Sequence, residues 1–186
     1  MSALLFEAQT GRARLGMKGP RAAEWLTERG IALPGAQNSW TFSGAAGSSG
    51  GLLVARLGSS EFFLEDAAQA PLLQGARRAL EEIPSGVYPV LREDAAFRLS
   101  GDGVHDVLAQ VCNVHFAALA LESYPVIMTL MLGVAVLVVP QASDHSRRDG
   151  ERSYRFWCDP TFAPFLGAAV GGVVVDCGGT VRGLPK

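Results

Sequence analysis

The sequence lacks the features that mark membrane-spanning, secreted or nucleic-acid-binding proteins. Its most apolar run, residues 126–139, has 14 residues, whereas a membrane-spanning helix needs about 20. The N-terminal segment MSALLFEAQTG has no basic region followed by a long apolar stretch, so a secretory signal is not supported. Lys and Arg are dispersed and the net charge is −2, which provides no basic face for a phosphate backbone. We therefore expect neither a membrane span nor a nucleic-acid partner.

Cysteine is scarce as well. The three cysteines, Cys112, Cys158 and Cys177, are odd in number and far apart, a pattern that favours reduced thiols in a cytoplasm over a disulfide framework. They form no C-x-x-C pair of the kind that binds zinc. What the chain does have is 186 residues with 48% hydrophobic content, enough for a globular domain with a substantial core.

The chain repeats itself. The segment LGMKGPRAAEWLTERG (15–30) aligns with FRLSGDGVHDVLAQVC (97–112), and each reads as a short strand, a glycine-containing turn and an amphipathic helix. Two pairs of residues align at a spacing of 82, Gly19 with Gly101 and Leu26 with Leu108.

Each of these two helices has its own start signal. Pro20 suits the first position of a helix, where a missing N–H costs nothing, and Asp102 is a candidate cap for the second helix. The second helix also has apolar residues at the spacing of one buried face. These residues are Val104, Val107, Leu108 and Val111.

The later parts of the two copies also correspond, because 52–73 resembles 134–166. The pairs at a spacing of 93 are Asp66 with Asp159, Pro71 with Pro164, and Leu73 with Leu166. The difference of 11 residues indicates an insertion at 141–152, polar and charged, where the first copy has only a short turn. There Gly58 and Ser59 predict a two-residue hairpin turn with glycine first.

By analogy with 52–65, the apolar run at 124–140 is predicted to be buried strand pairing. Its valines favour a pleated surface, and Gly133 interrupts it near the middle. Each copy then closes with a helix, the first starting at Pro71 and ending before Pro84. The tail 167–186 contains six glycines, so we expect a short helix there and a flexible end at 171–186.

These patterns predict an α+β fold of two pseudo-symmetric strand-helix-strands-helix repeats, with helices packed on mainly antiparallel sheet. The repeats span about 10–86 and 88–170. We expect residues 1–186 to form a single domain, because one repeat alone would leave much of its sheet unburied.

Three segments in this order carry a family resemblance: LGMKGPRAAEWLTERGIALP, YPVLREDAAFRLSGDGVHDVLAQVC and YRFWCDPTFAPFL. Over residues 10–167 the chain resembles the gamma subunit of heterotetrameric sarcosine oxidase, which is similar to the folate-binding aminomethyltransferase fold. The insertion at 141–152 and the glycine-rich C-terminus depart from the family pattern.

The resemblance implies a non-catalytic structural subunit of a cytoplasmic complex that oxidatively demethylates sarcosine to glycine and transfers the one-carbon unit to tetrahydrofolate. It also implies that FAD, FMN, NAD and tetrahydrofolate belong to the complex and not to this chain. The implied partners are larger flavin-binding alpha and beta subunits and a small zinc-binding delta subunit. The alternative is a free-standing folate-binding protein of the aminomethyltransferase type. That alternative needs a positioned carboxylate, for which the sequence offers scattered acids such as Asp66 and Glu93.

The residues capable of chemistry do not form a recognisable site. Cys112 and His115 could form a thiolate and base, but Cys112 aligns with Gly30 at a helix end, which favours a packed thiol. His105 and its neighbour Asp106 point in different directions on a helix. We therefore predict no catalytic, cofactor-binding or metal-binding residues in this chain.

Two further motifs have ordinary explanations. A metal could be suggested by Cys158, Asp159 and His145, but no closely spaced pair of ligands accompanies them. The turn SGDGVHD resembles a phosphate-binding turn, yet Asp102 puts a negative charge there and the G-x-G-x-x-G spacing is absent, so a tight turn is favoured.

Some aromatic and charged residues are candidates for contacts with partner subunits. We expect most of the large aromatic groups to lie in the core, but some must stay exposed if the chain binds a larger subunit. These groups are Trp25, Trp40, Tyr124, Phe162 and Phe165. The loop HSRRDGER at 145–152 is a candidate charged contact, or else a solvated loop.

Overall fold

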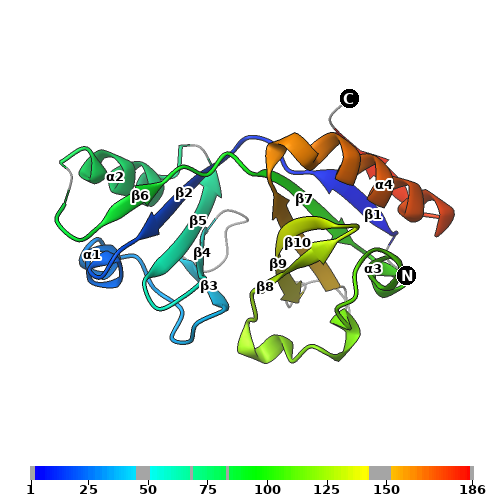
Figure 1. The fold of residues 1–186 in the computed structure, drawn as a ribbon, viewed down its shortest axis with the longest axis horizontal. Coiled ribbons are helices and arrows are strands. Elements are labelled where there is room, and N and C mark those ends of the chain that lie inside the picture. Colours follow the sequence, from blue (N-terminus) through cyan, green and yellow to red (C-terminus); the bar gives the residue numbers. More distant parts are fainter. Residues whose placement is uncertain (1–2, 45–50, 68, 83, 143–151, 185–186) are drawn as a thin grey trace. The chain divides into compact units, whose positions relative to one another are not determined.

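The chain forms two compact units. A computed structural model describes residues 3–44, 51–67, 69–82, 84–142 and 152–184. The first unit is Gly11–Glu93, and the second unit combines Met1–Thr10 with Asp94–Lys186. Each unit has its own hydrophobic core and is described here by itself (Figure 1). The expectation that both units form a single domain stays a prediction.

The first unit is a five-stranded sheet with two helices on one face. All its strand pairs are antiparallel, in the order β3-β4-β5-β2-β6. Its core joins Trp25 and Leu26 of α1 and Leu73 of α2 to the sheet. The elements are β2 (Arg12–Lys18), α1 (Ala22–Glu28), β3 (Ser39–Ser43), β4 (Leu52–Arg56), β5 (Glu61–Ala67), α2 (Pro71–Leu80) and β6 (Tyr88–Val90).

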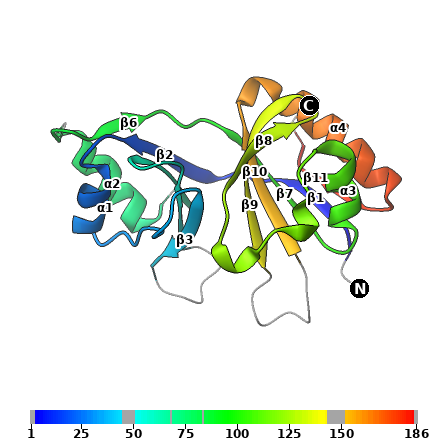
Figure 2. The same ribbon diagram turned by 60° about the horizontal axis from the view of Figure 1, so that its bottom comes forward.

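The second unit is a six-stranded sheet in the order β8-β9-β10-β7-β1-β11. Its pairs are antiparallel except β1 with β11, and α3 and α4 pack on the sheet (Figure 2). The elements are β1 (Leu5–Ala8), β7 (Ala95–Ser100), α3 (Val104–Val111), η1 (Phe116–Ala118), η2 (Leu121–Ser123), β8 (Ile127–Met131), β9 (Val134–Ala142), β10 (Arg152–Cys158), η3 (Pro160–Phe162), α4 (Ala163–Asp176) and β11 (Thr180–Arg182).

The internal repeat is confirmed by the order of the strands. Strands β3-β4-β5-β2 of the first unit correspond to β8-β9-β10-β7 of the second. In each sheet the next strand comes from the other repeat. Strand β1 precedes β2 in sequence but pairs with β7, and β6 precedes β7 but pairs with β2. The α+β class and the largely antiparallel pairing are therefore as predicted.

The starts of the paired helices differ from the sequence prediction in detail. Helix α1 begins at Ala22, two residues after Pro20, because Gly19 and Pro20 first form a turn in which Ala22 N–H donates to Gly19 O. The N-cap of α3 is Gly103 with φ +83°, not Asp102. The predicted buried face of α3 is confirmed at all four positions.

The apolar run forms the hairpin of β8 and β9, as predicted. Leu132 and Gly133 both have positive φ at its turn, the conformation of a two-residue turn that matches the twist of the strands. The run is not wholly buried, however. On the edge strand β8 the burial alternates, and the outward side chains Met128 and Leu130 are 56% and 60% exposed.

The predicted two-residue turn at Gly58 and Ser59 is wrong. Arg56 pairs with Phe62, and Leu57 N–H donates to Glu61 O, so the loop is longer. The Arg56 guanidinium donates to Gly58 O and to Ser59 O at 3.2 Å each. These bonds satisfy turn carbonyls, and Gly58 is not among the glycines with a positive φ.

The C-terminal tail is also more ordered than its composition predicts. Helix α4 has 14 residues and continues to Asp176, and β11 then pairs with β1. A Cβ at Gly167 would lie 3.5 Å from Phe97, and one at Gly171 would lie 3.2 Å from Leu184, so these glycines admit close packing. Burial of Leu166, Val170 and Val174 offsets the low helix propensity of glycine. None of the described helices is long and apolar enough to cross a membrane.

Candidate functional site

A hollow of about 440 Å³ in the second unit collects several of the residues singled out in the sequence. It lies between α3 and the segment that follows it, where Cys112 ends the helix in an extended conformation. The lining residues are His105, Asp106, Leu108, Ala109, Cys112, Asn113, Val114, His115, Phe116 and Ala117.

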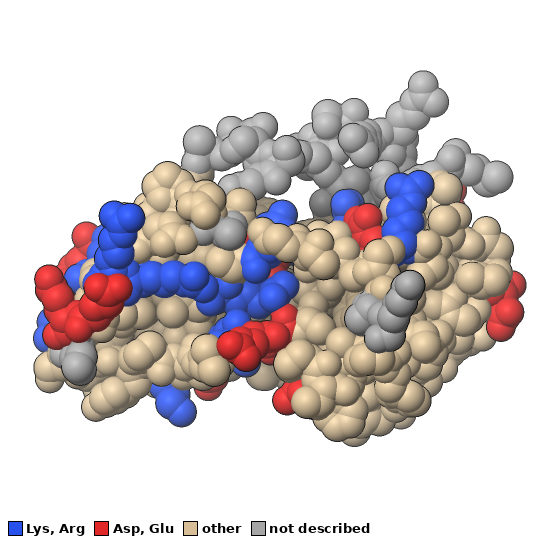
Figure 3. Space-filling view, turned by 90° about the horizontal axis from the view of Figure 1, so that it is seen from above, with Lys and Arg blue, Asp and Glu red and all other residues tan. Residues whose placement is uncertain are grey.

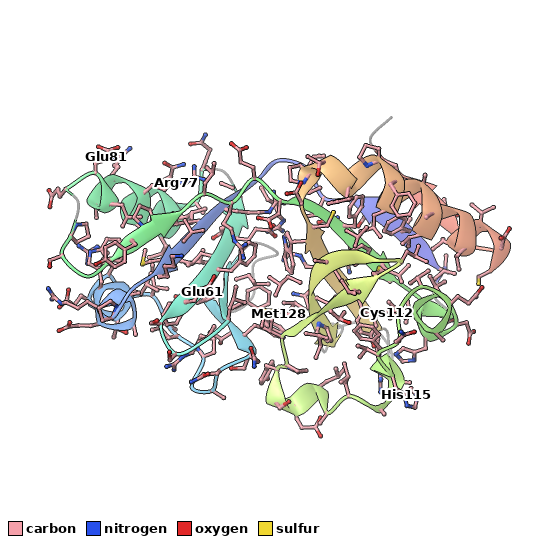
Figure 4. The ribbon with its side chains drawn as sticks, viewed as in Figure 1. Glu61, Arg77, Glu81, Cys112, His115 and Met128 are labelled. Carbon is pink, nitrogen blue, oxygen red and sulfur yellow. The ribbon has the colours of Figure 1, made fainter. Side chains whose placement is uncertain are left out.

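Cys112 and His115 line the same hollow but differ in exposure. Cys112 is 7% exposed, and its Sγ donates to Leu130 O at 3.3 Å. The His115 side chain is exposed on the segment leading into η1 (Figure 4). Among the hydrogen bonds of the described residues, none joins the two side chains. The geometry is that of a packed thiol held by a backbone carbonyl.

His105 has a partner that the sequence analysis missed. Its Nε2 lies 2.7 Å from the hydroxyl of Tyr154 on β10, and the donor depends on the imidazole tautomer. Burial, and then the positive charge of Arg152, lower the pKa of His105. Burial raises the pKa of Tyr154, which Arg152 partly offsets. The structure thus favours a neutral imidazole beside a neutral phenol.

The contact between His105 and Tyr154 is partly buried and helps to hold α3 against β10. Tyr154 is fully buried and packs edge-on against Phe116, so its hydroxyl faces the imidazole and not the solvent. Asp106, the neighbour of His105, is exposed on α3 and lines the same hollow, so the predicted divergence of these two side chains stays a prediction. No local sequence signal links a helix residue to a tyrosine 49 positions later.

The suggested metal ligands have other roles. Burial raises the pKa of the Cys158 thiol to about 11, with further contributions from Asp159 and Asp94. Asp159 Oδ1 accepts hydrogen bonds from the Thr161 N–H at 2.8 Å and hydroxyl at 2.6 Å, which starts η3. His145 lies outside the described residues, and within those residues no three side chains of ligand type come together.

Two buried carboxylates of the first unit, Asp66 and Glu65, are engaged within the protein. Asp66 is 3% exposed, and its Oδ1 accepts from the Ala67 N–H at 2.7 Å. Glu93 is exposed. The most buried carboxylate is Glu65, fully buried on β5, whose Oε2 lies 2.6 Å from Arg14 Nε. Sequence reasoning missed this ion pair because charged residues on a strand usually face solvent.

The aromatic candidates divide between core and surface. Trp25 and Trp40 are 4% and 7% exposed and belong to the interior, whereas Tyr124, Phe162 and Phe165 are 56%, 50% and 55% exposed. Three of the five are exposed, so the expectation that most of them lie in the core is wrong. Most of the charged loop at 145–152 lies outside the described residues. All three cysteines are free thiols, as predicted.

Comparisons with known proteins identify the fold. No protein-family model matches the sequence, and no curated protein sequence matches it. A chain of the heterotetrameric sarcosine oxidase from Corynebacterium sp. U-96, solved in complex with pyrrole 2-carboxylate, is similar with a TM-score of 0.69 and 20% identity. The match covers 97% of this chain and 88% of that chain.

A second solved structure is also similar. The glycine cleavage system aminomethyltransferase T from Bartonella henselae has a TM-score of 0.65 and 16% identity, with 98% of this chain covered. The match covers 48% of that chain, so this chain spans about half its length. Both structures are of the kinds that the sequence resemblance indicated, and the fold of this chain is the aminomethyltransferase-like fold that they share.

Proposed function

We propose that this chain is a non-catalytic structural subunit, of the gamma type, in a heterotetrameric sarcosine oxidase complex. One observation carries the proposal. The sarcosine oxidase chain matches over nearly the whole of both chains, whereas the aminomethyltransferase extends to about twice the matched length. The similarity is thus to a small chain of a multi-subunit enzyme more than to a complete transferase.

The chemistry of the hollow supports the same proposal. Its thiol and one of its imidazoles have hydrogen-bond partners within the chain, and its carboxylate, Asp106, is exposed on a helix surface. Such an arrangement offers no activated nucleophile and no base held towards a reacting atom. Under the proposal, FAD, FMN, NAD and tetrahydrofolate are held elsewhere in a cytoplasmic complex. The alpha and beta subunits and a zinc-binding delta subunit are its proposed partners.

The alternative is a free-standing folate-binding protein of the aminomethyltransferase type, which the similarity over 98% of this chain favours. A reduced folate would need a carboxylate aimed into a pocket. Asp66 already accepts a backbone hydrogen bond, and Glu65 is paired with Arg14 and Arg12.

Titration calorimetry of the isolated full chain with a reduced folate separates the two functions. The structural-subunit proposal predicts no binding at micromolar concentrations. Saturable binding in that range, abolished by Asp106→Asn or Asp66→Asn, would establish the alternative instead. Circular dichroism of each variant shows whether the fold is kept.

A further inference from the structure

Strand β1 occupies a site that its own repeat does not build. By the spacing of 82 residues between the repeats, residues 6–8 of β1 align with Tyr88–Val90, which form β6. Strand β1 nevertheless pairs with β7 of the second repeat, and β6 pairs with β2 of the first. Two repeats that exchange their first strands reproduce, within one chain, the arrangement of a strand-swapped dimer. The site of β1 therefore receives a strand that another part of the chain donates.

The second unit holds β1 inside its sheet. Strand β1 pairs with β7 on one side and with β11 on the other. Next to the strand, Gln9 N–H donates to Ala96 O at 2.8 Å. At the other end, Leu4 O accepts from Thr180 N–H at 2.9 Å. If β1 left, the facing edges of β7 and β11 would lose their backbone partners. An extended strand is the ligand that satisfies both edges.

The inward side chains of β1 fill the core of the second unit. Leu4, Phe6 and Ala8 alternate along the strand, and all three pack into that core. Phe6 is fully buried, and its ring stacks on Phe97 and Phe156 at centroid distances of 5.4 and 5.8 Å. Removal of the Phe6 ring would leave a cavity beside these two rings. The site therefore requires apolar side chains at alternate positions, with a large one in the middle.

Charge contributes little to this site. On the face of the second unit that Figure 3 shows, charged side chains are sparse. The charged residue of β1 is Glu7, whose Oε1 lies 3.9 Å from Arg98 Nη1, and both side chains are partly exposed. Solvent screens such a pair, so it adds little to binding. The backbone and the apolar side chains of the strand therefore decide whether it binds.

The reciprocal strand β6 contributes much less to the first unit. It has three residues and lies at the edge of its sheet, next to β2. Its side chains Tyr88 and Pro89 are exposed. The exchange of strands is therefore asymmetric, and the second unit is the one that depends on a donated strand.

We propose that the second unit has a strand-binding site between β7 and β11, which β1 occupies as a ligand held by noncovalent contacts. The ligand class is an extended peptide with apolar side chains at the positions of Leu4, Phe6 and Ala8. The peptide bond between Thr10 and Gly11 is not required for this binding, so a separate peptide with the sequence of β1 binds at the same site. This inference does not depend on the proposed function.

The first experiment cuts the connection in the folded full chain. A site for a sequence-specific protease is inserted between Thr10 and Gly11, where both residues are exposed and a Cβ at Gly11 would meet nothing within 4 Å. After cleavage at micromolar concentration, we expect residues 1–10 to co-elute with the rest of the chain in gel filtration and to separate in denaturant. Mass spectrometry of the fractions detects the segment. Its loss in native buffer would overturn the proposal.

The second experiment tests which side chains the site requires. The cleaved chain is unfolded and refolded with an excess of a fluorescently labelled peptide of residues 1–10, and fluorescence anisotropy measures the bound fraction. A Phe6→Ala peptide should bind more than about a hundredfold more weakly than the wild-type peptide, because it leaves a buried cavity. A Glu7→Gln peptide is the matched control and should bind within about threefold of wild type.

Two results of the peptide experiment would contradict the proposal. Equal binding of the Phe6→Ala and wild-type peptides would show that the buried ring does not select the ligand. Failure of the wild-type peptide to enter a chain that has refolded, as circular dichroism shows, would overturn the strand-binding site itself.

Discussion

Gly19 and Gly101 hold equivalent positions in the two repeats, directly after the corresponding strands β2 and β7. Their φ angles are +130° and +99°. An added Cβ would collide with the carbonyl oxygen of Gly86 at the first position and of Ala3 at the second. Each glycine thus lets the strand end turn closely past a neighbouring backbone, a requirement that only glycine meets.

We predict that Gly101→Ala destabilises the protein by more than about 2 kcal/mol, because both the backbone conformation and the space exclude a side chain. Gly75→Ala is the matched control. It lies in α2 with nothing within 4 Å of an added Cβ, so alanine should stabilise by about 0.5–1 kcal/mol. Urea unfolding of both variants measures the difference. A Gly101→Ala variant as stable as wild type would contradict the account of this turn.

The buried ion pair of Arg14 and Glu65 makes a second prediction. Glu65 is fully buried at 2.6 Å from Arg14 Nε and 3.9 Å from Arg12 Nε, so Glu65→Gln removes the buried negative charge that pairs with both guanidinium groups. We expect a loss of about 3 kcal/mol in the free energy of unfolding. Glu24→Gln, which removes the exposed pair with Arg21, should lower the free energy of unfolding far less, because solvent screens exposed charges. Similar losses in the two variants would show that burial of Glu65 has no energetic consequence.

His105 predicts a dependence of stability on pH. Because burial lowers its pKa in the folded state, the unfolded chain binds the proton more readily. Stability is therefore fully present above the unfolded pKa of about 6.5 and falls as the pH drops through it towards the folded pKa. His105→Gln should reduce the loss of stability between about pH 7.5 and pH 5.5. His115→Gln, an exposed site, serves as the comparison, and an unchanged pH dependence in His105→Gln would refute the assignment.

The thiols should react unequally. Cys177 is exposed, whereas Cys112 and Cys158 are buried, and burial raises the pKa of Cys158 to about 11. An aromatic disulfide reagent at about pH 8 should therefore modify one thiol rapidly in the native chain and all three after denaturation. Cys177→Ser should abolish the rapid phase. Rapid modification of Cys112 would contradict this prediction and would make a catalytic role for Cys112 possible again. Retention of activity by a complex that carries Cys112→Ser would exclude that role.

The repeat made much of the fold predictable. Aligned glycines, leucines and prolines recur in matching structural positions, since Leu26 and Leu108 are buried in their cores and α2 and α4 begin at or next to the aligned prolines. The strand pairing of the apolar run also followed from its first-copy counterpart. The pattern of apolar residues predicts these helices and strands, because each depends on residues close in sequence.

Long-range packing accounts for what sequence reasoning missed. The glycine-rich α4 is stabilised by side chains such as Phe97 and Leu184 that fill the space above its glycines. The amino-acid composition of α4 does not reveal these distant contacts. Strand β1 pairs with β7, more than 80 residues away. The candidate site shows the same limit, because the contact of His105 with Tyr154 joins a helix to a distant strand.

The central claim, that this chain is a structural subunit of a flavin-containing complex, is tested most directly by affinity isolation of the tagged chain from its native cells. Mass spectrometry of the eluate, its visible spectrum and sarcosine-dependent peroxide formation are measured together. We predict a yellow complex with large subunits that forms peroxide when sarcosine is added. A colourless chain recovered alone, with no sarcosine-dependent activity, would contradict the account.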